Sequence, residues 1–419
     1  MSASLSTPLN ASMVRGACPR LSTPMQTGDG LLARIVPAGP MGIDAFADLC
    51  AAARKHGNGL MEISARGSLQ VRGLDQTSAP LFAATVEALD LDICGCVPVI
   101  ASPLPDDPSA LLDSHALAAD LREAIAISER ILAPKLSVIV DSGGQLHLDG
   151  LTADIRLCAA PVADGPKFLV SVAGNAASAT PLGMVALRDA SKLVLDLLNV
   201  IEAHGPDARA AHIDIDELRA VAKTRLSPTV EVAPRAPAET IGLHRLKDGA
   251  CAIGVALEFG QAHADDLMAL AGIAAANGGT WVASAPDRTL LLGPIDEMTG
   301  FVLATAADNL GFVVDARDAR RRVVACPGSP SCTSGLIATR VLATEIARML
   351  PVAQNGIAVH VSGCTKGCAH PTEAPLTIVG TEQGCGVIHD GTARARPERH
   401  VEAGELAAKI NTMREPVNA

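Results

Sequence analysis

The sequence has few aromatic residues: they make up 2% of its 419 residues, with no tyrosine and a single tryptophan. A site that depends on aromatic stacking, such as the base-stacking surface of a single-strand binder, is therefore disfavoured. Charged residues make up only 19%, acidic residues outnumber basic ones by 45 to 34, and no stretch is rich in Lys and Arg. Because nucleic-acid binding needs a basic patch, we expect no nucleic-acid partner.

Long apolar runs are absent as well. No stretch approaches the ~20 uninterrupted apolar residues of a membrane span, and the first twenty residues lack the apolar core of a secretory signal. We therefore expect a cytoplasmic protein with no membrane partner. In that compartment the 11 cysteines are expected to be thiols, metal ligands or catalytic groups, because cytosolic reductants keep thiols reduced. Hydrophobic residues make up 48%, which is typical of globular domains, and the length has room for about two or three.

An internal repeat organises the chain. The segment from Gly28 to Leu74 returns as Lys247 to Ile295. In each copy the pattern predicts a strand, then a helix that ends near a glycine (Gly57 or Gly278), then two more strands. This is the order of half a ferredoxin-like unit. We therefore expect an α+β fold with two ferredoxin-like half-modules related by pseudo-two-fold symmetry, at residues 22–76 and 241–300.

The segments that follow the two half-modules look unlike each other. Residues 85–225 contain an acidic, Pro-rich stretch, a helical run at 114–132 and an expected hairpin around Ser142-Gly143-Gly144. Residues 305–419 instead carry a group of cysteines. Prolines interrupt residues 226–240, which we expect to be a linker.

Four cysteines in the C-terminal third have the spacing of a metal centre. Cys326 and Cys332 are separated by five residues, Cys364 and Cys368 by three, and 31 residues lie between the pairs. Thr333 and Ser334 are expected to cap a helix over 335–350, whose N-terminus would stabilise an anionic centre. A structural Cys₄ zinc site is the alternative to an iron–sulfur cluster. Zinc pairs typically enclose two to four residues, so the wider Gly/Pro/Ser-rich first loop favours the bulkier cluster.

These motifs resemble the nitrite and sulfite reductase superfamily, whose members carry a 4Fe-4S cluster on C-x5-C and C-x3-C pairs and two ferredoxin-like half-modules. Within it the chain resembles the precorrin-3B synthase branch. The similar tracts are ARGSLQVRG (65–73), APKLSVIVDSGG (133–144) and GCAHP (367–371), in which His370 stands where the reductases typically have Asn. The reductases also share a Lys-x-Lys pair, whereas here Lys135 is followed at the second position by Ser137.

The resemblance implies an α/β cluster- and tetrapyrrole-binding domain built from segments 85–225 and 305–419. It implies oxygen-dependent hydroxylation of precorrin-3A to precorrin-3B, with γ-lactone formation, in aerobic cobalamin biosynthesis. Electrons would pass through a 4Fe-4S cluster on Cys326, Cys332, Cys364 and Cys368 to a mononuclear non-haem iron. The expected partners are precorrin-3A, dioxygen and a reductant such as NADH or an electron-transfer protein. No G-x-G-x-x-G fingerprint follows a strand, so a nicotinamide would donate through another protein or an atypical site.

A polycarboxylate substrate would be held by guanidinium and ammonium groups. The residues expected to bind it are Arg34, Arg66, Gln70, Arg72, Lys135 and Arg288. Arg66 and Arg72 would share one sheet face if a regular strand ran through both, and replacing either is expected to weaken substrate affinity more than thermal stability. His370 is the expected catalytic residue. It and His360 flank the second cysteine pair and are the nearest candidate iron ligands.

Two other functions remain open at this stage. One is sirohaem-dependent nitrite or sulfite reduction in the same architecture, with Cys368 bridging the cluster and the haem iron. The other is a non-enzymatic iron–sulfur electron carrier, although a carrier has no need of a duplicated module that encloses a macrocycle.

Overall fold

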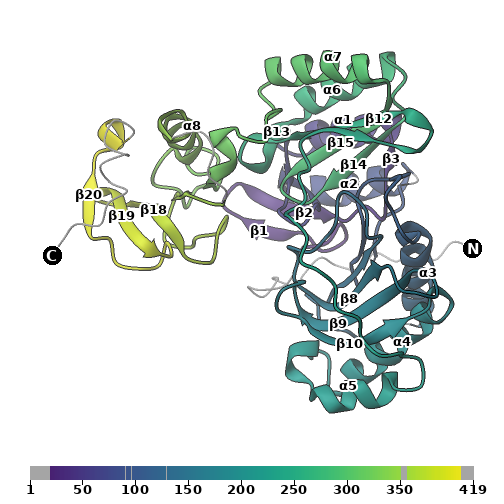
Figure 1. Ribbon diagram of the computed structural model, residues 1–419. Helices are drawn as coiled ribbons and strands as arrows, with labels where there is room; N and C mark the ends of the chain where they lie inside the picture. The colour runs from purple at the N-terminus through teal and green to yellow at the C-terminus, as the bar shows by residue number, and fades with distance from the viewer. Residues whose placement is uncertain (1–18, 90, 96, 129, 351–355, 407–419) are drawn as a thin grey trace, which may run out of the picture.

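The computed structural model describes residues 19–89, 91–95, 97–128, 130–350 and 356–406. They contain four five-stranded sheets with helices packed on their faces (Figure 1). Sheets I and II belong to the two half-modules, and sheets III and IV to the segments that follow them. Sheet IV, at the C-terminal end of the described chain, stands to one side of the other three.

Sheets I and II each take one short strand from the other half of the chain. Sheet I has the order β1 (Met25–Thr27), β2 (Gly30–Ile35), β5 (Leu69–Leu74), β4 (Leu60–Ile63), β13 (Gln261–His263). Sheet II has the order β11 (Gly242–Arg245), β12 (Cys251–Ala256), β15 (Thr289–Ile295), β14 (Trp281–Ala285), β3 (Met41–Gly42). Strand β3 pairs with β14, and in return β13 pairs with β4. This reciprocal exchange confirms the expected α+β fold with two related half-modules.

Helices cover one face of each of these sheets because apolar residues recur at helical spacing. Helix α1 (Ile43–His56) buries Phe46, Leu49 and Cys50 and ends where Gly57 follows. It packs against α6 (Ala264–Ala276), with α2 (Ser78–Glu87) beside α1 and α7 (Glu297–Asn309) beside α6 (Figure 1). One hydrophobic core runs through both half-modules.

Sheets III and IV share one topology. Sheet III runs β6 (Val99–Ala101), β7 (Val138–Asp141), β8 (Ala153–Ala160), β9 (Lys167–Gly174), β10 (Thr180–Val185). Sheet IV runs β16 (Val323–Ala325), β17 (Val359–Ser362), β18 (Ala374–Thr381), β19 (Gly384–Gly391), β20 (Arg399–Val401). In both, the first three strands are parallel and the last two antiparallel. Helix α3 (Ser114–Ile127) or α8 (Thr339–Met349) joins the first two strands.

The expectation that the two segments differ in kind is therefore wrong. Val138 pairs with Ile155 and Val359 with Leu376, so the two strand pairs are 221 positions apart. The same offset relates the pairs Met61–Val71 and Val282–Leu292 of the half-modules. The chain is a tandem duplication of half-module plus sheet.

Three local expectations also need correction. Residues 142–152 form no hairpin strand: β7 is buried along its whole length, as parallel strands are, and a loop returns the chain to the parallel β8. Helix α8 begins at Thr339, so Thr333 and Ser334 lie too far before its first turn to cap it. They belong to a loop that packs closely, through Gly335, on the backbone of Gly328. The helical run expected at 114–132 ends at Ile127.

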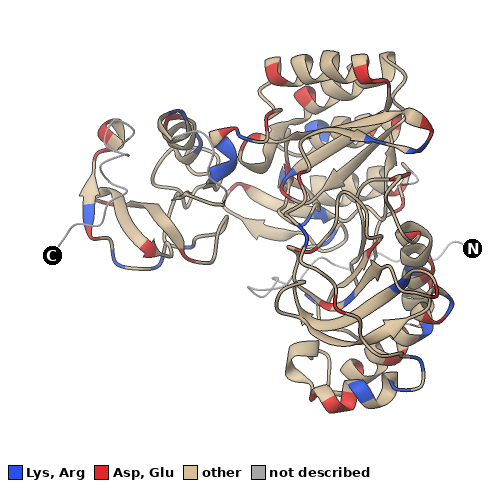
Figure 2. Ribbon diagram, viewed as in Figure 1, with Lys and Arg blue, Asp and Glu red and all other residues tan. Residues whose placement is uncertain are grey.

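The remaining elements cover sheet III or connect modules. They are α4 (Leu187–Ala203), α5 (Ile215–Ala222) and the 3₁₀ turns η1 (Ala210–His212), η2 (Lys247–Gly249), η3 (Glu258–Gly260) and η4 (Ala319–Arg322). Residues 228–240 contain no helix or strand. Charged residues lie mainly on helices and loops, and the strands are drawn almost wholly in tan (Figure 2). Within the described ranges, no helix has both the length and the apolarity that a membrane crossing requires.

Candidate functional site

A cavity of about 870 Å³ lies between sheet I and the loops that follow β16 and β17. Its wall contains all four cysteines of the two sequence pairs: Cys326, Cys332, Cys364 and Cys368. The volume is at the upper end of the range for small-molecule sites. It suits a macrocycle better than a small oxyanion.

Each cysteine pair sits on a loop at the carboxyl end of a parallel strand. Cys326 directly follows β16, and Cys364 lies two residues beyond the end of β17. Because β16 and β17 are adjacent and parallel, their carboxyl ends meet at one edge of the sheet, which is the usual place for a site in such sheets. Sγ of Cys326 accepts a hydrogen bond from the backbone N–H of Gly363 at 3.1 Å. Such bonds to sulfur tune iron–sulfur centres.

Glycines allow the loops around the cysteines to approach closely. A Cβ on Gly335 would lie 2.7 Å from the backbone of Gly328. A Cβ on Gly28, between β1 and β2, would lie 2.3 Å from Sγ of Cys332, and the Gly28 carbonyl accepts the N–H of Thr333 at 3.0 Å. The β1–β2 hairpin of the half-module therefore covers the first cysteine loop.

The spacing of the sulfurs separates the two candidate metal centres. Tetrahedral zinc, with Zn–S bonds of about 2.3 Å, brings its four sulfurs to about 3.8 Å from one another. Among the described residues, no three of these four sulfurs lie within 4.8 Å of one another. The donor set therefore fits a cluster of several iron and sulfide ions better than a single zinc ion.

A row of polar side chains crosses sheet I on the face away from the helices. The register places Gln261, Glu62, Gln70 and Arg34 side by side on β13, β4, β5 and β2. Glu62 and Gln70 line the cavity. Because these positions are polar, this face of sheet I borders the cavity, whereas the opposite face packs into the apolar core.

The equivalent face of sheet II is apolar. Ala283 and Leu291 pair there as Glu62 and Gln70 do in sheet I. Both are buried in a hydrophobic cluster of their own. Ala283 and Leu291 therefore offer no counterpart to the polar pair of sheet I, among the described residues of this face, for holding a charged ligand.

Leucines from sheet III fill that second position. Leu104 lies three residues after β6 and Leu146 five residues after β7, and both belong to the same cluster as Leu291. In the second copy, the residues three after β16 and five after β17 are Gly328 and Gly367. Large side chains thus cover the apolar face of sheet II, whereas a Cβ at the two equivalent glycines would meet Thr339 and Ala393.

The cavity wall has a strong excess of positive charge. The chain as a whole has a net charge of −11. Among the described residues that line the cavity, five side chains are cationic and one is a carboxylate: Arg72, Arg288, Arg340, Lys366, Arg394 and Glu62. The site is built for an anionic ligand.

Arg72 lies on the cavity wall, but its donors are already used. It forms a two-pronged ion pair with Asp29, with both N···O distances 2.7 Å, and a third contact to Glu62 at 3.1 Å. Burial alone would lower the pKa of Arg72, but the hydrogen bonds and charges of these two carboxylates raise it above its ordinary value. Strand β5 begins at Leu69, so Arg66 lies outside it and the two arginines do not share a face.

Arg288 presents a free guanidinium to the cavity. It has no hydrogen-bond or ion-pair partner on its side chain among the described residues. Burial lowers its pKa, while the carboxylates of Asp287 and Glu62 oppose that shift. Its φ of 64° is in the left-handed region, which is costly for a long side chain. Backbone strain at an unpaired cation is typical of a ligand-binding position.

The other expected substrate-binding residues are placed differently. Gln70 lines the cavity. Arg34 donates to Ser68 and borders a smaller neighbouring hollow of about 340 Å³. Arg66 donates to the carbonyl of Thr152 and to Ser137, which ties the half-module to sheet III. Lys135 is exposed in the loop before β7.

His370 is not on the cavity wall. Its Nε2 lies 3.1 Å from the Thr372 hydroxyl and 3.2 Å from the Glu373 carbonyl. Its ring meets the ring of His360 edge-on, with centroids 5.6 Å apart. His360 is completely buried, and burial lowers its pKa to about 4, with His370 adding to the shift. His360 is therefore neutral at physiological pH.

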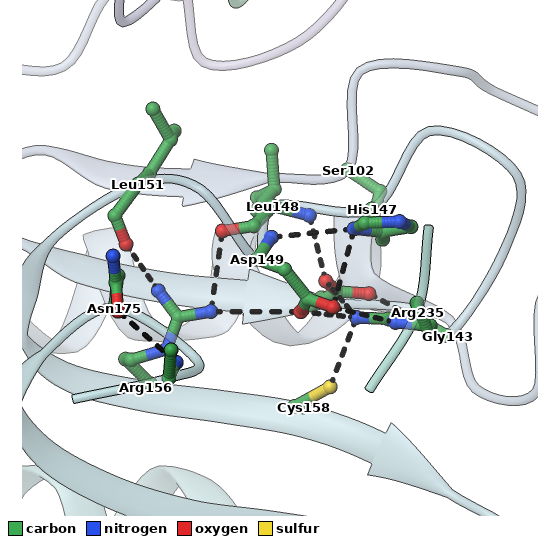
Figure 3. A network of polar contacts seen from close by, with 12 residues as sticks. Ser102, Gly143, His147, Leu148, Asp149, Leu151, Arg156, Cys158, Asn175 and Arg235 are labelled. Atoms are coloured by element: carbon green, nitrogen blue, oxygen red, sulfur yellow. Dashed lines mark hydrogen bonds and ion pairs between the residues drawn. The ribbon is translucent and has the colours of Figure 1, made fainter. Parts of the chain in front are cut away.

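One group of three potential metal-ligand side chains lies elsewhere, at the end of β7. Ligand atoms of Asp141, His147 and Asp149 lie within 4.8 Å of one another. The guanidinium of Arg235 occupies this position, 2.5 Å from Asp149 and 2.9 Å from Asp141 (Figure 3). In the described part of the chain, no such group of three borders the cavity. The residues present therefore do not fit a mononuclear iron site there.

Three cavity residues escaped prediction from the sequence. Lys366 lies between Cys364 and Cys368, and its ammonium donates to Ser334 of the other cysteine loop at 2.8 Å. Its place inside the C-x3-C motif was a usable signal. Arg340 and Arg394 come from α8 and from the loop after β19, and nothing in the sequence marks them.

Comparison with known proteins gives an independent result. No family model matches the chain. A precorrin-3B synthase from a Sinorhizobium species is 33% identical over 405 residues, which is 96% of this chain and 88% of that protein. A sulfite reductase [ferredoxin] from Mycobacterium tuberculosis is 30% identical over 152 residues, 34% of this chain and 27% of that protein.

The fold has a counterpart among solved structures. The Mycobacterium tuberculosis NirA protein superimposes with a TM-score of 0.67 at 20% identity, over 91% of this chain and 79% of that chain. Together with the extended match to the Sinorhizobium protein, this shows that the chain belongs to the precorrin-3B synthase family, an enzyme family within the nitrite and sulfite reductase superfamily.

Proposed function

We propose that the protein is an oxidoreductase that hydroxylates precorrin-3A to precorrin-3B with dioxygen, with γ-lactone formation, in aerobic cobalamin biosynthesis. One observation carries the proposal: a macrocycle-sized cavity, bordered by four cysteines, has five cationic side chains against one carboxylate in an acidic protein. A precorrin carries many carboxylate arms, and such a wall matches it. The family relationship supports the same substrate.

The four cysteines would hold a 4Fe-4S cluster, which when bound supplies one-electron transfer at the edge of the cavity. Cys326, Cys332, Cys364 and Cys368 fit it because they line one wall without the close spacing of a zinc site. The Gly363 N–H to Cys326 orients one sulfur, and the Lys366–Ser334 bond ties the two cysteine loops together.

The basic residues would position the substrate. Arg288 is free to form a charge-assisted bond to a carboxylate arm, and Lys366 and Arg394 offer further cations on the opposite wall. Gln70 adds a neutral donor and acceptor. Holding several arms at once would fix the macrocycle so that one carbon is presented for reaction. No step is assigned to a mononuclear iron, because the cavity-lining residues described here form no three-ligand site for it.

The first test concerns the cluster. Anaerobically purified protein should contain iron and acid-labile sulfide, give a cluster signal by electron paramagnetic resonance, and form precorrin-3B from precorrin-3A with air and a reductant. Cys→Ser at any of the four positions should remove the signal, whereas Cys158→Ser on sheet III should retain it. Intense sirohaem absorption would favour the reductase alternative, and a cluster without product formation would favour the electron carrier.

The second test concerns the substrate. A charge-assisted hydrogen bond is worth about 1.5–3 kcal/mol, so Arg288→Gln should weaken precorrin-3A binding roughly 10- to 150-fold. Its thermal stability should stay near that of the wild type, because the side chain has no hydrogen bond or ion pair to lose within the described part of the chain. Arg188→Gln, at a side chain 87% exposed on α4, is the matched control. Equal affinities for the two variants would remove Arg288 from the binding site.

A further inference from the structure

Arg340 is a half-buried cation at the start of α8. It is the second residue of α8, and it lines the same cavity as the cysteines. Its neighbour Thr339 donates a hydrogen bond from its hydroxyl to the carbonyl of Cys326. The start of α8 is thereby fastened to the first cysteine of the motif.

The guanidinium of Arg340 is held on several sides. Nη1 donates to the Glu258 carbonyl at 2.9 Å, and the guanidinium carbon lies 5.7 Å from the centre of the Phe259 ring. Nη2 is 3.9 Å from a carboxylate oxygen of Glu62. Phe259 has a φ of 50°, a strained conformation for a bulky residue. The η3 turn therefore holds this cation in place at the cost of its own backbone strain.

One donor of Arg340 remains unused. Its Nε is buried and has no acceptor among the described residues. A buried N–H of a charged group is costly to leave unpaired, so an acceptor is expected in the space beside it. The negative charges that act on the guanidinium are those of Glu62, the Cys326 sulfur and Glu258, in that order. Cys326 is the one of the three that belongs to the cysteine motif, and the hydrogen bond from Thr339 to its carbonyl fixes it beside the start of α8.

We propose that Arg340 is a positioning residue for the iron–sulfur cluster, whose fixed charge and free Nε–H raise the cluster's reduction potential. The inference rests on the proposed function only in requiring that the four cysteines bind a cluster. Reduction adds one electron and no proton, so the negative charge facing Arg340 increases by one. A cation in a wall of low dielectric favours the more negative state. Arg340 thus makes the cluster easier to reduce by the donor.

The test is a redox titration of the purified holoprotein followed by electron paramagnetic resonance. Arg340→Gln should lower the midpoint potential, with the one-electron equilibrium shifted at least tenfold, which corresponds to 59 mV. Arg340→Lys, which keeps the charge, should stay closer to the wild type. Arg348→Gln, at an exposed arginine in the last turn of the same helix, should leave the potential unchanged.

The outcomes distinguish the possible failures. An Arg340→Gln protein with a full cluster and the potential of the Arg348→Gln control would overturn the inference. Loss of the cluster in both Arg340→Gln and Arg340→Lys would also overturn it, because the side chain would then act only as an anchor for η3. Loss in Arg340→Gln alone, with a loaded and wild-type-like Arg340→Lys, would support it. Wild-type protein without iron and sulfide would refute the proposed function itself.

Discussion

Replacing Arg72 with alanine should damage the fold before it damages substrate binding. The side chains of Arg72 and Asp29 are only 9% and 5% exposed, and Glu62 is the third partner. Removing one member of a buried ion pair costs about 3–5 kcal/mol, because the remaining charge is left without compensation. In Arg72→Ala, Asp29 loses its cation, and Glu62 keeps the longer contact to Arg340. Asp29 also lies next to Gly28, which packs on the Cys332 loop, so the cluster site should loosen as well.

The expected change in melting temperature follows from the length of the chain. An unfolding entropy of about 2.1 cal/mol/K per residue, taken over 419 residues, converts about 3–5 kcal/mol into a decrease of roughly 3–6 °C. Differential scanning calorimetry would measure it. Arg54→Ala is the matched control, since it breaks an ion pair of the same 2.7 Å length whose side chains are 57% and 66% exposed. Exposed pairs are worth about 1 kcal/mol or less.

A smaller effect would refute this reasoning. If Arg72→Ala and Arg54→Ala melted at the same temperature, the buried ion pair would not stabilise the half-module. If Arg72→Ala kept its melting temperature and lost only precorrin-3A affinity, the role expected from the sequence alone would be correct.

Two further predictions concern the packing at the first cysteine loop and the ion pair beside sheet III. Gly28→Ala should lower the iron and sulfide content, because its Cβ would lie 2.3 Å from Sγ of Cys332. The control Gly272→Ala, in α6 with open space around it, should leave the iron and sulfide content unchanged and add up to about 1 kcal/mol of stability. Equal iron and sulfide contents in the two variants would contradict the packing argument. Arg235→Ala should destabilise the protein most at neutral pH. Burial raises the pKa of Asp149, but the hydrogen bond and charge of Arg235 outweigh it and lower that pKa, so the contribution exists above the ordinary Asp pKa and is lost as the pH falls through the folded value. Melting curves of both proteins from pH 7 down to about 3 should converge, and a constant difference would exclude the ion pair as the cause.

The half-modules and the cysteine set could be predicted because their signals are local or repeated. Helix α1 follows from apolar spacing and a terminal glycine, and the same pattern returns in α6. The four cysteines needed only their spacing, and the structure places all of them on one cavity. Sheet IV could not be recognised as a copy of sheet III. The two sheets share their strand order and register, and buried parallel strands can keep both with any set of apolar residues.

The roles of individual arginines were beyond prediction for a different reason. Arg72 and Arg288 both line the cavity, yet one is neutralised by Asp29, 43 positions away, and the other is free. Arg66 turns instead toward Thr152 of sheet III. The sequence cannot distinguish these roles, because the partners of each guanidinium are distant along the chain and come close only in the folded protein.

Spacing and repetition along the chain were enough to predict a duplicated α+β protein and to single out the four cysteines that the structure places on one cavity, because both depend on residues close in sequence or on a pattern that occurs twice. Which copy keeps an open cavity was decided by folding. Leu104 and Leu146 pack with Ala283 and Leu291 on sheet II, whereas Glu62 and Gln70 of sheet I border the cavity. That difference has meaning only once the loops face the sheets on which they pack.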